Sequence, residues 1–207
     1  MRAEDEALIR RQLLRLAAEV FPGRVSVGIA PVQGVSLKPE EETAMARAVP
    51  SRRAEFSAGR AAAREALGWD VVVPMGPDRA PVWPEGVTGS ITHAGGWALA
   101  VVGEGLVGID LEVDEPLPED VRETVLLPAE RDTDGHQARL IFSAKECAYK
   151  AQYPLTRELF DFQTLGVTLG EGLFRAELQR PVGPFRRGAV LEGRFAIGGG
   201  FILTGIG

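Results

Sequence analysis

Two carboxylates stand two residues apart in the segment Gly108–Glu112, which reads GIDLE. Side chains alternate between the two faces of a strand, so Asp110 and Glu112 are predicted to point the same way while the apolar residues beside them face the core. Neighbouring carboxylates repel each other unless a proton or a cation lies between them, and a hard divalent ion with oxygen ligands suits that place. An isolated pair of this kind is, however, also common on solvated strand faces.

A helical segment, Phe142–Lys150 (FSAKECAYK), supplies a third acid. Its Glu146 and Lys150 are four residues apart and therefore share one helix face. A weak surface ion pair explains this spacing equally well. The segment is nevertheless similar to Phe56–Arg64 (FSAGRAAAR), in which Arg60 takes the place of the glutamate. A reversal of charge between two copies of one motif indicates that the copies have specialised.

A second repeat singles out a histidine. The segment Gly89–Gly103 (GSITHAGGWALAVVG) matches Gly193–Gly207 (GRFAIGGGFILTGIG), with glycines recurring at four equivalent positions. His93 in the first copy corresponds to Ile197 in the second, so the fold does not require a histidine there. A lone histidine in a strand is more often structural, but this comparison favours a binding role for His93.

A group of arginines lies in the first half of the chain, namely Arg52, Arg53, Arg60, Arg64 and Arg79. Arg52 and Arg60 are eight residues apart, about two helical turns, and are predicted to share a face. Fixed guanidinium groups can bind phosphates in a bidentate manner. The alternative is a solvated helix face, and both interpretations stay open on these residues alone.

The segments GSITH, GIDLE and FSAKECAYKA, in this order and spacing, resemble the 4′-phosphopantetheinyl transferases that activate siderophore, peptide and polyketide synthases. The resemblance is to the type of the enterobactin-synthase component D and the surfactin-synthetase activator, which also carries segments similar to residues 52–64 and 79–84. It covers roughly residues 37–160. Arg79 stands where many members have lysine, which preserves the charge.

This resemblance implies that the chain transfers the 4′-phosphopantetheine group of coenzyme A to a serine of an apo acyl or peptidyl carrier protein, releasing 3′,5′-ADP. It implies one Mg2+ ion, or Mn2+, bound by Asp110, Glu112 and Glu146. Lys145 and Lys150 are expected to neutralise the pyrophosphate, and Lys150 to protonate the leaving group. Glu146 or a metal-bound water is expected to be the base, so the expected catalytic residues are Glu146, Lys150 and Asp110.

The same resemblance implies a site for the 3′-phosphate of coenzyme A. His93, Arg52 and Arg79 are expected to hold this phosphate, with Arg60 nearer the adenine and Ser90 as a further contributor. Two other functions stay open. One is another Mg2+-dependent hydrolase that processes coenzyme A, and the other is a non-catalytic coenzyme A-binding module.

These residues need a fold that brings distant segments together, and the repeats indicate which fold. They predict an α/β (α+β) protein with two pseudo-two-fold related lobes, approximately residues 1–108 and 109–207, within a single enzyme unit spanning 1–207. Each lobe is expected to be a small sheet packed with a long helix. The active site is expected at the interface between the lobes.

The periodicity of apolar residues predicts helices at residues 4–20, 51–67 and 137–152, the last ending before Pro154. The Gly95-Gly96 pair predicts a hairpin between two strands. Strands are expected at residues 24–32, 91–93, 97–102, 107–113, 167–169, 173–178, 190–197 and 201–206.

Composition excludes several classes of protein and site. The chain has 207 residues and a net charge of −6, which argues against general nucleic-acid binding, although a local basic patch stays possible. One cysteine and two histidines exclude an internal disulfide, a thiolate zinc site and a multi-histidine metal site. The acidic N-terminus and the lack of a long apolar run predict a soluble, cytoplasmic protein with no membrane partner, expected to be a monomer.

The carrier serine must reach the metal, so the docking surface for the carrier protein is expected to border Glu146. The resemblance also implies carrier proteins that are acidic around their modified serine, and this chain is itself acidic, so the contact should rely on apolar surface and a few local cations. The expected platform comprises the turn 154–157 and the side chains of Tyr149, Gln152, Tyr153, Leu117, Val121, Leu126 and Leu127. The alternative is that the leucines belong to the core.

Overall fold

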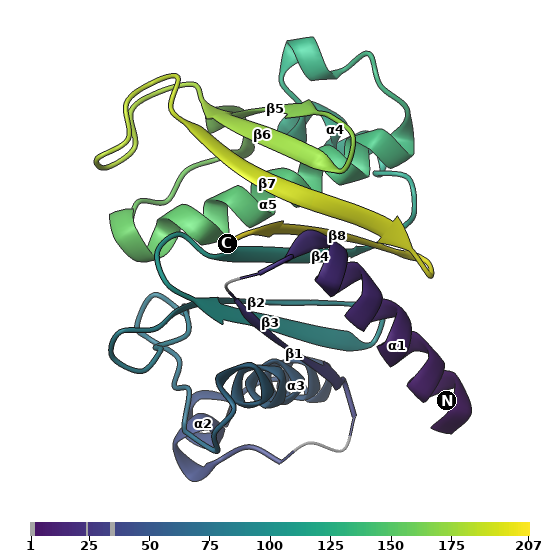
Figure 1. Cartoon of the computed structure of the whole chain (residues 1–207). Helices are drawn as coiled ribbons and strands as arrows, with labels where there is room; N and C mark the ends of the chain where they lie inside the picture. Colours follow the sequence, from purple (N-terminus) through teal and green to yellow (C-terminus); the bar gives the residue numbers. More distant parts are fainter. Residues whose placement is uncertain (1–2, 24, 34–35) are drawn as a thin grey trace.

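The computed structural model describes residues 3–23, 25–33 and 36–207. Two antiparallel sheets meet along neighbouring edge strands, β2 and β4, and each sheet carries a long helix on one face (Figure 1). The first sheet has the strand order β1-β3-β2 and consists of β1 (Ser26–Pro31), β2 (Thr88–Ala94) and β3 (Trp97–Gly103). The second has the order β4-β8-β7-β6-β5 and consists of β4 (Gly108–Val113), β5 (Leu165–Leu169), β6 (Leu173–Leu178), β7 (Val190–Gly198) and β8 (Phe201–Ile206).

The helices follow the expected positions, with two short additions. They are α1 (Ala3–Val20), α2 (Pro39–Ala44), α3 (Pro50–Leu67), α4 (Glu119–Val125) and α5 (Gly135–Thr156). The sequence patterns missed α2 and α4, which are too short to show a full apolar period. Arg24, expected to begin the first strand, lies outside the described residues. The mixed α/β architecture with two sheets is confirmed.

The predicted end of the long helix before Pro154 is wrong. Helix α5 continues through Pro154 to Thr156. Because Pro154 lies in the last turn, its missing N–H removes a single helical hydrogen bond, and the Arg157 N–H then closes the turn on the Tyr153 carbonyl at 2.9 Å. Arg157 itself takes the left-handed conformation typical of a helix end, with φ 55°.

The two sheets repeat one arrangement, since the order β1-β3-β2 corresponds to β4-β8-β7. The glycines at the start of the two matching segments occupy the same surroundings. A Cβ on Gly89 would lie 2.8 Å from the Val101 carbonyl, and one on Gly193 would lie 2.6 Å from the Gly205 carbonyl. Each of these glycines is also covered by an aromatic ring. This correspondence supports the duplication inferred from the repeats.

Glycines also let each long helix pack directly against the strand that begins its sheet. A Cβ on Gly28 of β1 would lie 2.0 Å from the carbonyl of Ala62 in α3. A Cβ on Gly108 of β4 would lie 2.4 Å from the carbonyl of Cys147 in α5. Any larger residue would push the helix away, so these glycines set how close the functional faces of α3 and α5 come to the strands.

Helix α1 packs mainly on β7 and β8 of the second sheet, although it precedes the first sheet in the chain. Its buried residues Leu13, Leu16 and Val20 join a core cluster that contains Ile109 of β4 and Leu203 of β8. The N-terminal helix therefore links the two halves. No helix among the described residues is long and apolar enough to cross a bilayer.

Part of the expected carrier platform lies in the core. Leu126 and Gln152 have no exposed surface, and Leu117 is 3% exposed. Leu117 and Leu126 pack with Ile141 of α5 in the core of the second half, because the segment before α5 folds back on that helix. These three residues are therefore removed from the expected docking platform, and Leu155, which is 59% exposed, stays in the turn beside it.

Candidate active site

A cavity of about 330 Å3 opens at the junction of the two sheets. Its walls come from α3, the loop before β2, β2, β4 and α5, so both halves of the molecule contribute. Eight of the ten site residues expected from the sequence line it, namely Arg52, Arg60, Arg79, His93, Asp110, Glu112, Glu146 and Lys150. The structure thus brings together residues that lie almost 100 positions apart in the chain, as expected for a site between two lobes.

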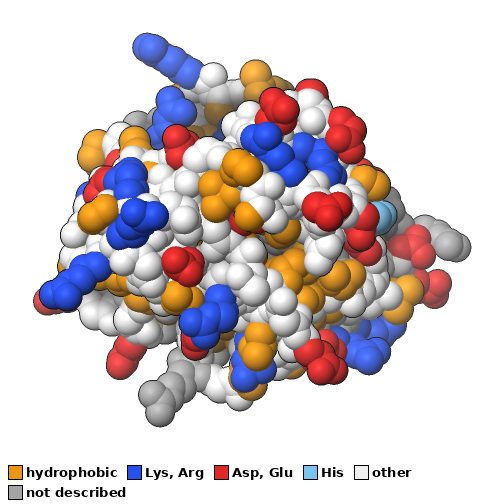
Figure 2. Space-filling model, turned by 90° about the horizontal axis from the view of Figure 1, so that it is seen from above, with side chains coloured by type: hydrophobic (Ala, Val, Ile, Leu, Met, Phe, Trp, Pro, Cys, Tyr) orange, Lys and Arg blue, Asp and Glu red, His pale blue; other side chains and the backbone are white. Residues whose placement is uncertain are grey.

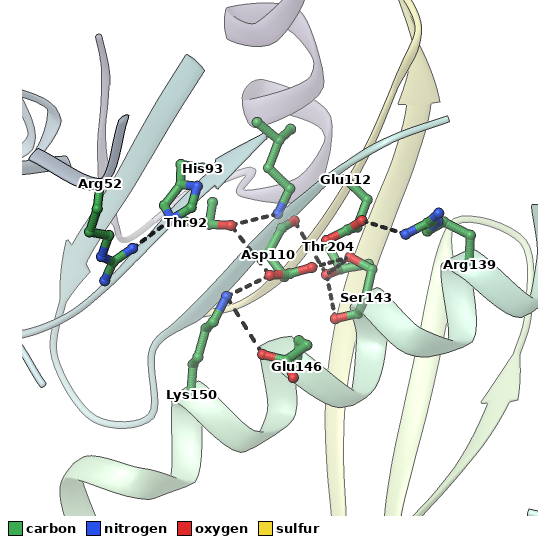
Figure 3. Close-up of polar contacts among 11 residues, drawn as sticks. Arg52, Thr92, His93, Asp110, Glu112, Arg139, Ser143, Glu146, Lys150 and Thr204 are labelled. Atoms are coloured by element: carbon green, nitrogen blue, oxygen red, sulfur yellow. Dashed lines mark hydrogen bonds and ion pairs between the residues drawn. The ribbon is translucent and has the colours of Figure 1, made fainter. Parts of the chain in front are cut away.

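Asp110 is the most buried acid of the cavity, with 3% of its surface exposed. Its Oδ1 accepts hydrogen bonds from Lys150 Nζ at 2.5 Å and from Thr92 Oγ1 at 3.3 Å (Figure 3). Its Oδ2 accepts from Ser143 Oγ at 2.8 Å, and Ser143 is in turn 2.9 Å from Thr204 Oγ1. Thr204 lies directly opposite Asp110 in the β4–β8 ladder. Donors from α5 and β2 therefore hold this carboxylate in place, and Thr204 of β8 contacts the Ser143 hydroxyl behind it.

Glu112 points into the same cavity as Asp110, as strand alternation predicts. Arg139 Nη1 donates to Glu112 Oε2 at 3.0 Å, and the same guanidinium donates to the carbonyls of Glu115 and Pro116, each at 3.2 Å. Burial, together with the neighbouring charge of Asp110, raises the pKa of Glu112 to about 7, although Arg139 opposes the shift. Glu112 is therefore partly protonated at neutral pH.

Glu146 and Lys150 of α5 line the same cavity as the two carboxylates of β4. Glu146 Oε2 is 4.0 Å from Lys150 Nζ, so the predicted shared helix face is present. Burial raises the pKa of Glu146 above its ordinary value. Burial alone would lower the pKa of Lys150, but the charges of Asp110 and Glu146 outweigh it and hold that pKa above its ordinary range. Lys150 is therefore a cation at the centre of an acidic site.

The acidic wall of the cavity consists of Asp110, Glu112 and Glu146. This set of carboxylates fits a hard divalent cation. Three carboxylates face one cavity, and burial followed by the charge of Asp110 raises the pKa of Glu112 and Glu146, so a cation bound among them would stabilise their ionised forms. Oxygen donors of this kind match Mg2+ or Mn2+. Within residues 3–23, 25–33 and 36–207, no three acidic, histidine or cysteine side chains stand close enough to share one ion as they are. Lys150 and Arg139 engage Asp110 and Glu112 instead.

The facing wall, from α3 and β2, is cationic. Arg60 is 5% exposed, donates from Nε to the Val73 carbonyl at 2.6 Å, and lies over the ring of Phe56 at 4.0 Å. Burial lowers the pKa of Arg60 to about 10, so it stays charged at neutral pH. The carbonyl bond and the ring fix the guanidinium at the cavity wall, ready to meet an anion.

Arg52 and His93 meet at the mouth of this wall. Arg52 Nη1 is 3.3 Å from His93 Nε2 (Figure 3). The same Nη1 is 3.4 Å from Glu55 Oε2. Burial lowers the pKa of His93, with Glu55 opposing and Arg52 adding to the shift. His93 is therefore neutral at pH 7 in this arrangement, and an incoming anion would favour its protonation.

Two expected residues are not brought to the cavity. Lys145 is 1% exposed, and its Nζ donates to Glu130 Oε2 and the Val125 carbonyl, both at 2.7 Å. Its expected role at the pyrophosphate is therefore corrected to a structural one. Ser90 is 4% exposed, does not line the cavity, and has no hydrogen-bond partner for its Oγ within the described part of the chain.

Several site residues were missed by reasoning from the sequence, namely Glu55, Thr92, Arg139, Ser143 and Thr204. The repeat carried a signal for two of them. Thr92 and Thr204 both correspond to alanine in the other copy, which is the same kind of difference that pointed to His93. Arg139 had no such signal, because its role follows from contacts with a distant strand.

Comparison with known proteins identifies relatives of the whole chain. Residues 40–103 match the family of 4′-phosphopantetheinyl transferase N-terminal domains, and residues 106–185 match the 4′-phosphopantetheinyl transferase superfamily. The chain is 43% identical over 201 residues to the 4′-phosphopantetheinyl transferase Svp of Streptomyces mobaraensis, covering 86% of this chain and 81% of that protein.

Two further relatives define how far the similarity extends. The chain is 34% identical over 220 residues to the 4′-phosphopantetheinyl transferase PptT of Mycobacterium tuberculosis, covering 92% of this chain and 97% of that protein. It is 40% identical over 115 residues to the enterobactin synthase component D of Salmonella typhimurium, covering 48% of each. The similarity to Svp and PptT thus spans far more of the chain than the similarity to the enterobactin component.

Proposed function

Because the chain belongs to the 4′-phosphopantetheinyl transferase family, we propose that its interlobe cavity binds coenzyme A together with a divalent cation and presents them to a carrier protein. The chain is a transferase that uses coenzyme A and acts on carrier protein domains. The observation that supports this role for the cavity is its division into a cationic wall and an acidic wall. A polyphosphate ligand that also carries a metal needs both.

The cationic wall is suited to the nucleotide end of coenzyme A. Arg52, His93 and Arg79 would hold the 3′-phosphate, because all three line the cavity and offer donors to an anion. Arg60, held over Phe56, would lie nearer the adenine.

The acidic wall is suited to the pyrophosphate and its metal. Asp110, Glu112 and Glu146 would hold Mg2+ or Mn2+, which when bound supplies charge neutralisation at the phosphates and polarises the phosphorus that is attacked. Glu112 would lose its proton on metal binding, since a cation lowers a carboxylic pKa. Lys150 adds a fixed positive charge beside the same phosphates.

The chemistry assigned to the chain's own residues is a proton transfer on each side of the phosphoryl group. The hydroxyl of the carrier serine forms the new bond to the β-phosphorus while its proton passes to Glu146, a carboxylate that lines the same cavity. The bond between the β-phosphorus and the bridging oxygen breaks. Lys150 supplies a proton to that oxygen as 3′,5′-ADP leaves, and Asp110 keeps the ammonium group aligned.

The carrier protein would dock beside Glu146 at the C-terminal end of α5. Leu155, 59% exposed, and the exposed side chain of Arg157 offer apolar and cationic contacts there. On the face seen in Figure 2, basic side chains lie among acidic ones, so neither charge dominates it. Attraction to an acidic carrier would therefore be local. The monomeric state and cytoplasmic location expected from the sequence belong to the same proposal.

One assay tests this function. Apo-carrier proteins are incubated with coenzyme A, Mg2+ and the protein, and intact mass spectrometry measures the phosphopantetheine increment. We expect the increment with Mg2+ or Mn2+, and its loss in excess EDTA. Full modification in excess chelator would exclude the metal site, whereas consumption of coenzyme A without modification of any carrier would indicate a hydrolase.

A further inference from the structure

One carboxylate ties the loop that carries Arg79 to the end of the helix that carries Lys150. Asp78 Oδ2 accepts a hydrogen bond from Tyr153 Oη at 3.1 Å and an ion-pair hydrogen bond from Arg157 Nη1 at 2.9 Å. Asp78 lies in the loop between α3 and β2 of the first half, whereas Tyr153 and Arg157 end α5 in the second half. The contact therefore joins the two halves beside the cavity mouth.

The other oxygen of the same carboxylate shapes the loop itself. Asp78 Oδ1 accepts from the Ala80 N–H at 3.1 Å, a bond that spans Arg79 in the manner of an Asx-turn. Two backbone bonds close the turn around it, from Gly76 N to the Ala80 carbonyl at 2.8 Å and from Arg79 N to the Gly76 carbonyl at 2.9 Å. A Cβ on Gly76 would lie 2.7 Å from Asp78 Oδ1, so this glycine leaves room for the carboxylate.

Backbone strain gathers at both ends of this contact. Arg79 has φ 67° and Arg157 has φ 55°, and among the described residues these are the two non-glycine positions with positive φ. The left-handed region is unfavourable for a residue with a side chain and persists where surrounding contacts impose it. Here Asp78 bonds to the residue after Arg79 and to the side chain of Arg157, so one carboxylate supports both.

Arg79 is the part of the loop that faces the cavity. Its guanidinium makes no hydrogen bond or ion pair with any residue that the structure describes. The place of this side chain is therefore set by the backbone that carries it, and Asp78 holds that backbone from both sides.

We propose that Asp78, Tyr153 and Arg157 form a clasp that positions Arg79 for the phosphate-bearing ligand of the cavity. Asp78 is then a positioning residue that acts through Arg79. This role rests on the proposed function, in which Arg79 contacts the 3′-phosphate of coenzyme A. The clasp also makes coenzyme A binding depend on a contact between the halves, outside the cavity itself.

The test removes the clasp and leaves the turn and the helix end intact. In the double variant Tyr153→Phe/Arg157→Gly, both partners of Asp78 Oδ2 are lost, the ring at 153 is kept, and glycine accepts the positive φ at 157. Isothermal titration measures the Kd for coenzyme A and for 3′-dephospho-coenzyme A with Mg2+ present. Arg175→Ala, which breaks the surface ion pair with Glu192 at 2.5 Å, is the matched control.

We expect the double variant to raise the Kd for coenzyme A by about 3- to 10-fold, the range of one exposed ion pair plus one hydrogen bond. The Kd of the double variant for 3′-dephospho-coenzyme A should change less than about 2-fold, and so should the Kd of Arg175→Ala for coenzyme A. Arg79→Ala should itself weaken the binding of coenzyme A. In that background, removing the clasp should raise the Kd no further, because the clasp acts through the Arg79 side chain. Asp78→Asn, which keeps the Oδ1 acceptor, should give a smaller loss.

Two results would overturn the clasp while leaving the proposed function standing. One is an unchanged Kd in the double variant while Arg79→Ala weakens binding. The other is an equal rise in the Kd when the clasp is removed from the original protein and from Arg79→Ala, which would show that the clasp residues do not act through Arg79. If Arg79→Ala also leaves the Kd unchanged, the coenzyme A assignment of this wall fails, and the clasp fails with it.

Discussion

The two walls of the cavity come from equivalent parts of a duplicated architecture, yet they carry opposite charge. Helices α3 and α5 both contain an FSA segment and both pack on a strand glycine, Gly28 or Gly108. Where α3 has Arg60, α5 has Glu146, and both side chains line the cavity. Two residues after the strand glycine, β1 has Ala30 and β4 has Asp110. One backbone plan thus carries a cationic residue on one side of the cavity and an acidic residue on the other, as the proposed binding of phosphates and of a metal requires.

The ion pairs at a second pair of equivalent positions, Arg64 and Lys150, share the same sign of charge but lie in different places. Arg64 of α3 pairs with Glu41 at 2.8 Å, and that carboxylate also accepts from the Val73 N–H at 3.1 Å, away from the cavity. Lys150, its counterpart in α5, pairs with Asp110 inside the cavity. Equivalent cations therefore form an ion pair away from the cavity in the first half and inside the cavity, at the proposed reaction centre, in the second.

The largest effect is expected from the acid at the centre of the second half. Asp110→Asn keeps one of the two acceptor oxygens, for Ser143 or for Thr92, but removes the charge that holds Lys150 and would bind the metal. The transfer rate should fall by roughly 10²- to 10³-fold with the melting temperature nearly unchanged. Carrier modification followed by mass spectrometry measures the rate, and a rate within a few-fold of the original would remove Asp110 from the reaction centre.

Replacing the buried acid of the first half, Glu41, should lower stability and leave turnover nearly unchanged. Glu41→Gln removes the charge of a fully buried carboxylate and leaves the mostly buried Arg64 with only the exposed Asp70, 3.7 Å away, as an acidic neighbour. This should lower the free energy of unfolding by about 3 kcal/mol. Turnover by the folded protein should stay within a few-fold, since Glu41 does not line the cavity. Denaturant unfolding and steady-state rates check the two parts. A large loss of turnover without loss of stability would break the division between the halves.

His93 and Ile197 offer a smaller comparison at equivalent strand positions. His93→Ala should raise the Kd for coenzyme A by about 5- to 10-fold, and much less for 3′-dephospho-coenzyme A, because the 3′-phosphate is the proposed partner. Ile197→Ala, 50% exposed on the second hairpin, is the control and should leave both Kd values unchanged. Equal losses for the two ligands would contradict the assigned partner.

The pH dependence of the His93 effect follows from its pKa. Burial holds the pKa of His93 below its ordinary value, so the ring gains a proton, and with it attraction for phosphate, only toward acid pH. The ratio of the Kd of His93→Ala to that of the unchanged protein should therefore be larger at pH 6 than at pH 8. A ratio that rises with pH would require a neutral ring as the binding form.

The smallest effect is expected on stability, at Glu112. Its pKa in the folded protein is about 7, above the ordinary value of 4.5, so the folded state keeps a proton that the unfolded state releases. Stability therefore falls as pH rises from about 4.5 to 7. Without metal, Glu112→Gln should raise the melting temperature at pH 8 more than at pH 5. Mg2+ should raise the melting temperature of the unchanged protein and so reduce the gain from Glu112→Gln. An equal gain in melting temperature at pH 5 and pH 8 would exclude the ionisation of Glu112 as the cause.

Much of the site could be predicted because its chemistry lies on regular elements. Alternation along β4 places Asp110 and Glu112 on one face, and the four-residue spacing on α5 does the same for Glu146 and Lys150. Lys145 shows the limit of such reasoning. It precedes Glu146 directly, but a helix turns by about 100° per residue, so its side chain points into the core toward Glu130.

Other features depended on contacts that no local pattern records. Arg139 reaches Glu112 only because α5 packs across β4, and Asp78 reaches Tyr153 only because the two halves meet. Leu126 is apolar, and an apolar residue suits a docking surface as well as a core. Its burial follows from the path of the segment between β4 and α5, which the sequence does not determine by periodicity.

The division of work between the halves is tested most directly by the single-turnover rate of transfer at saturating coenzyme A. The variants Arg60→Gln and Glu146→Gln, at equivalent positions of α3 and α5, are compared side by side with one apo-carrier protein. Arg60→Gln should require more coenzyme A to saturate, yet then transfer within about 3-fold of the original rate. Glu146→Gln should be slower by about 10²-fold or more even at saturation. Similar rate losses in the two variants, or a larger loss in Arg60→Gln, would contradict the assignment of binding to the first half and reaction to the second.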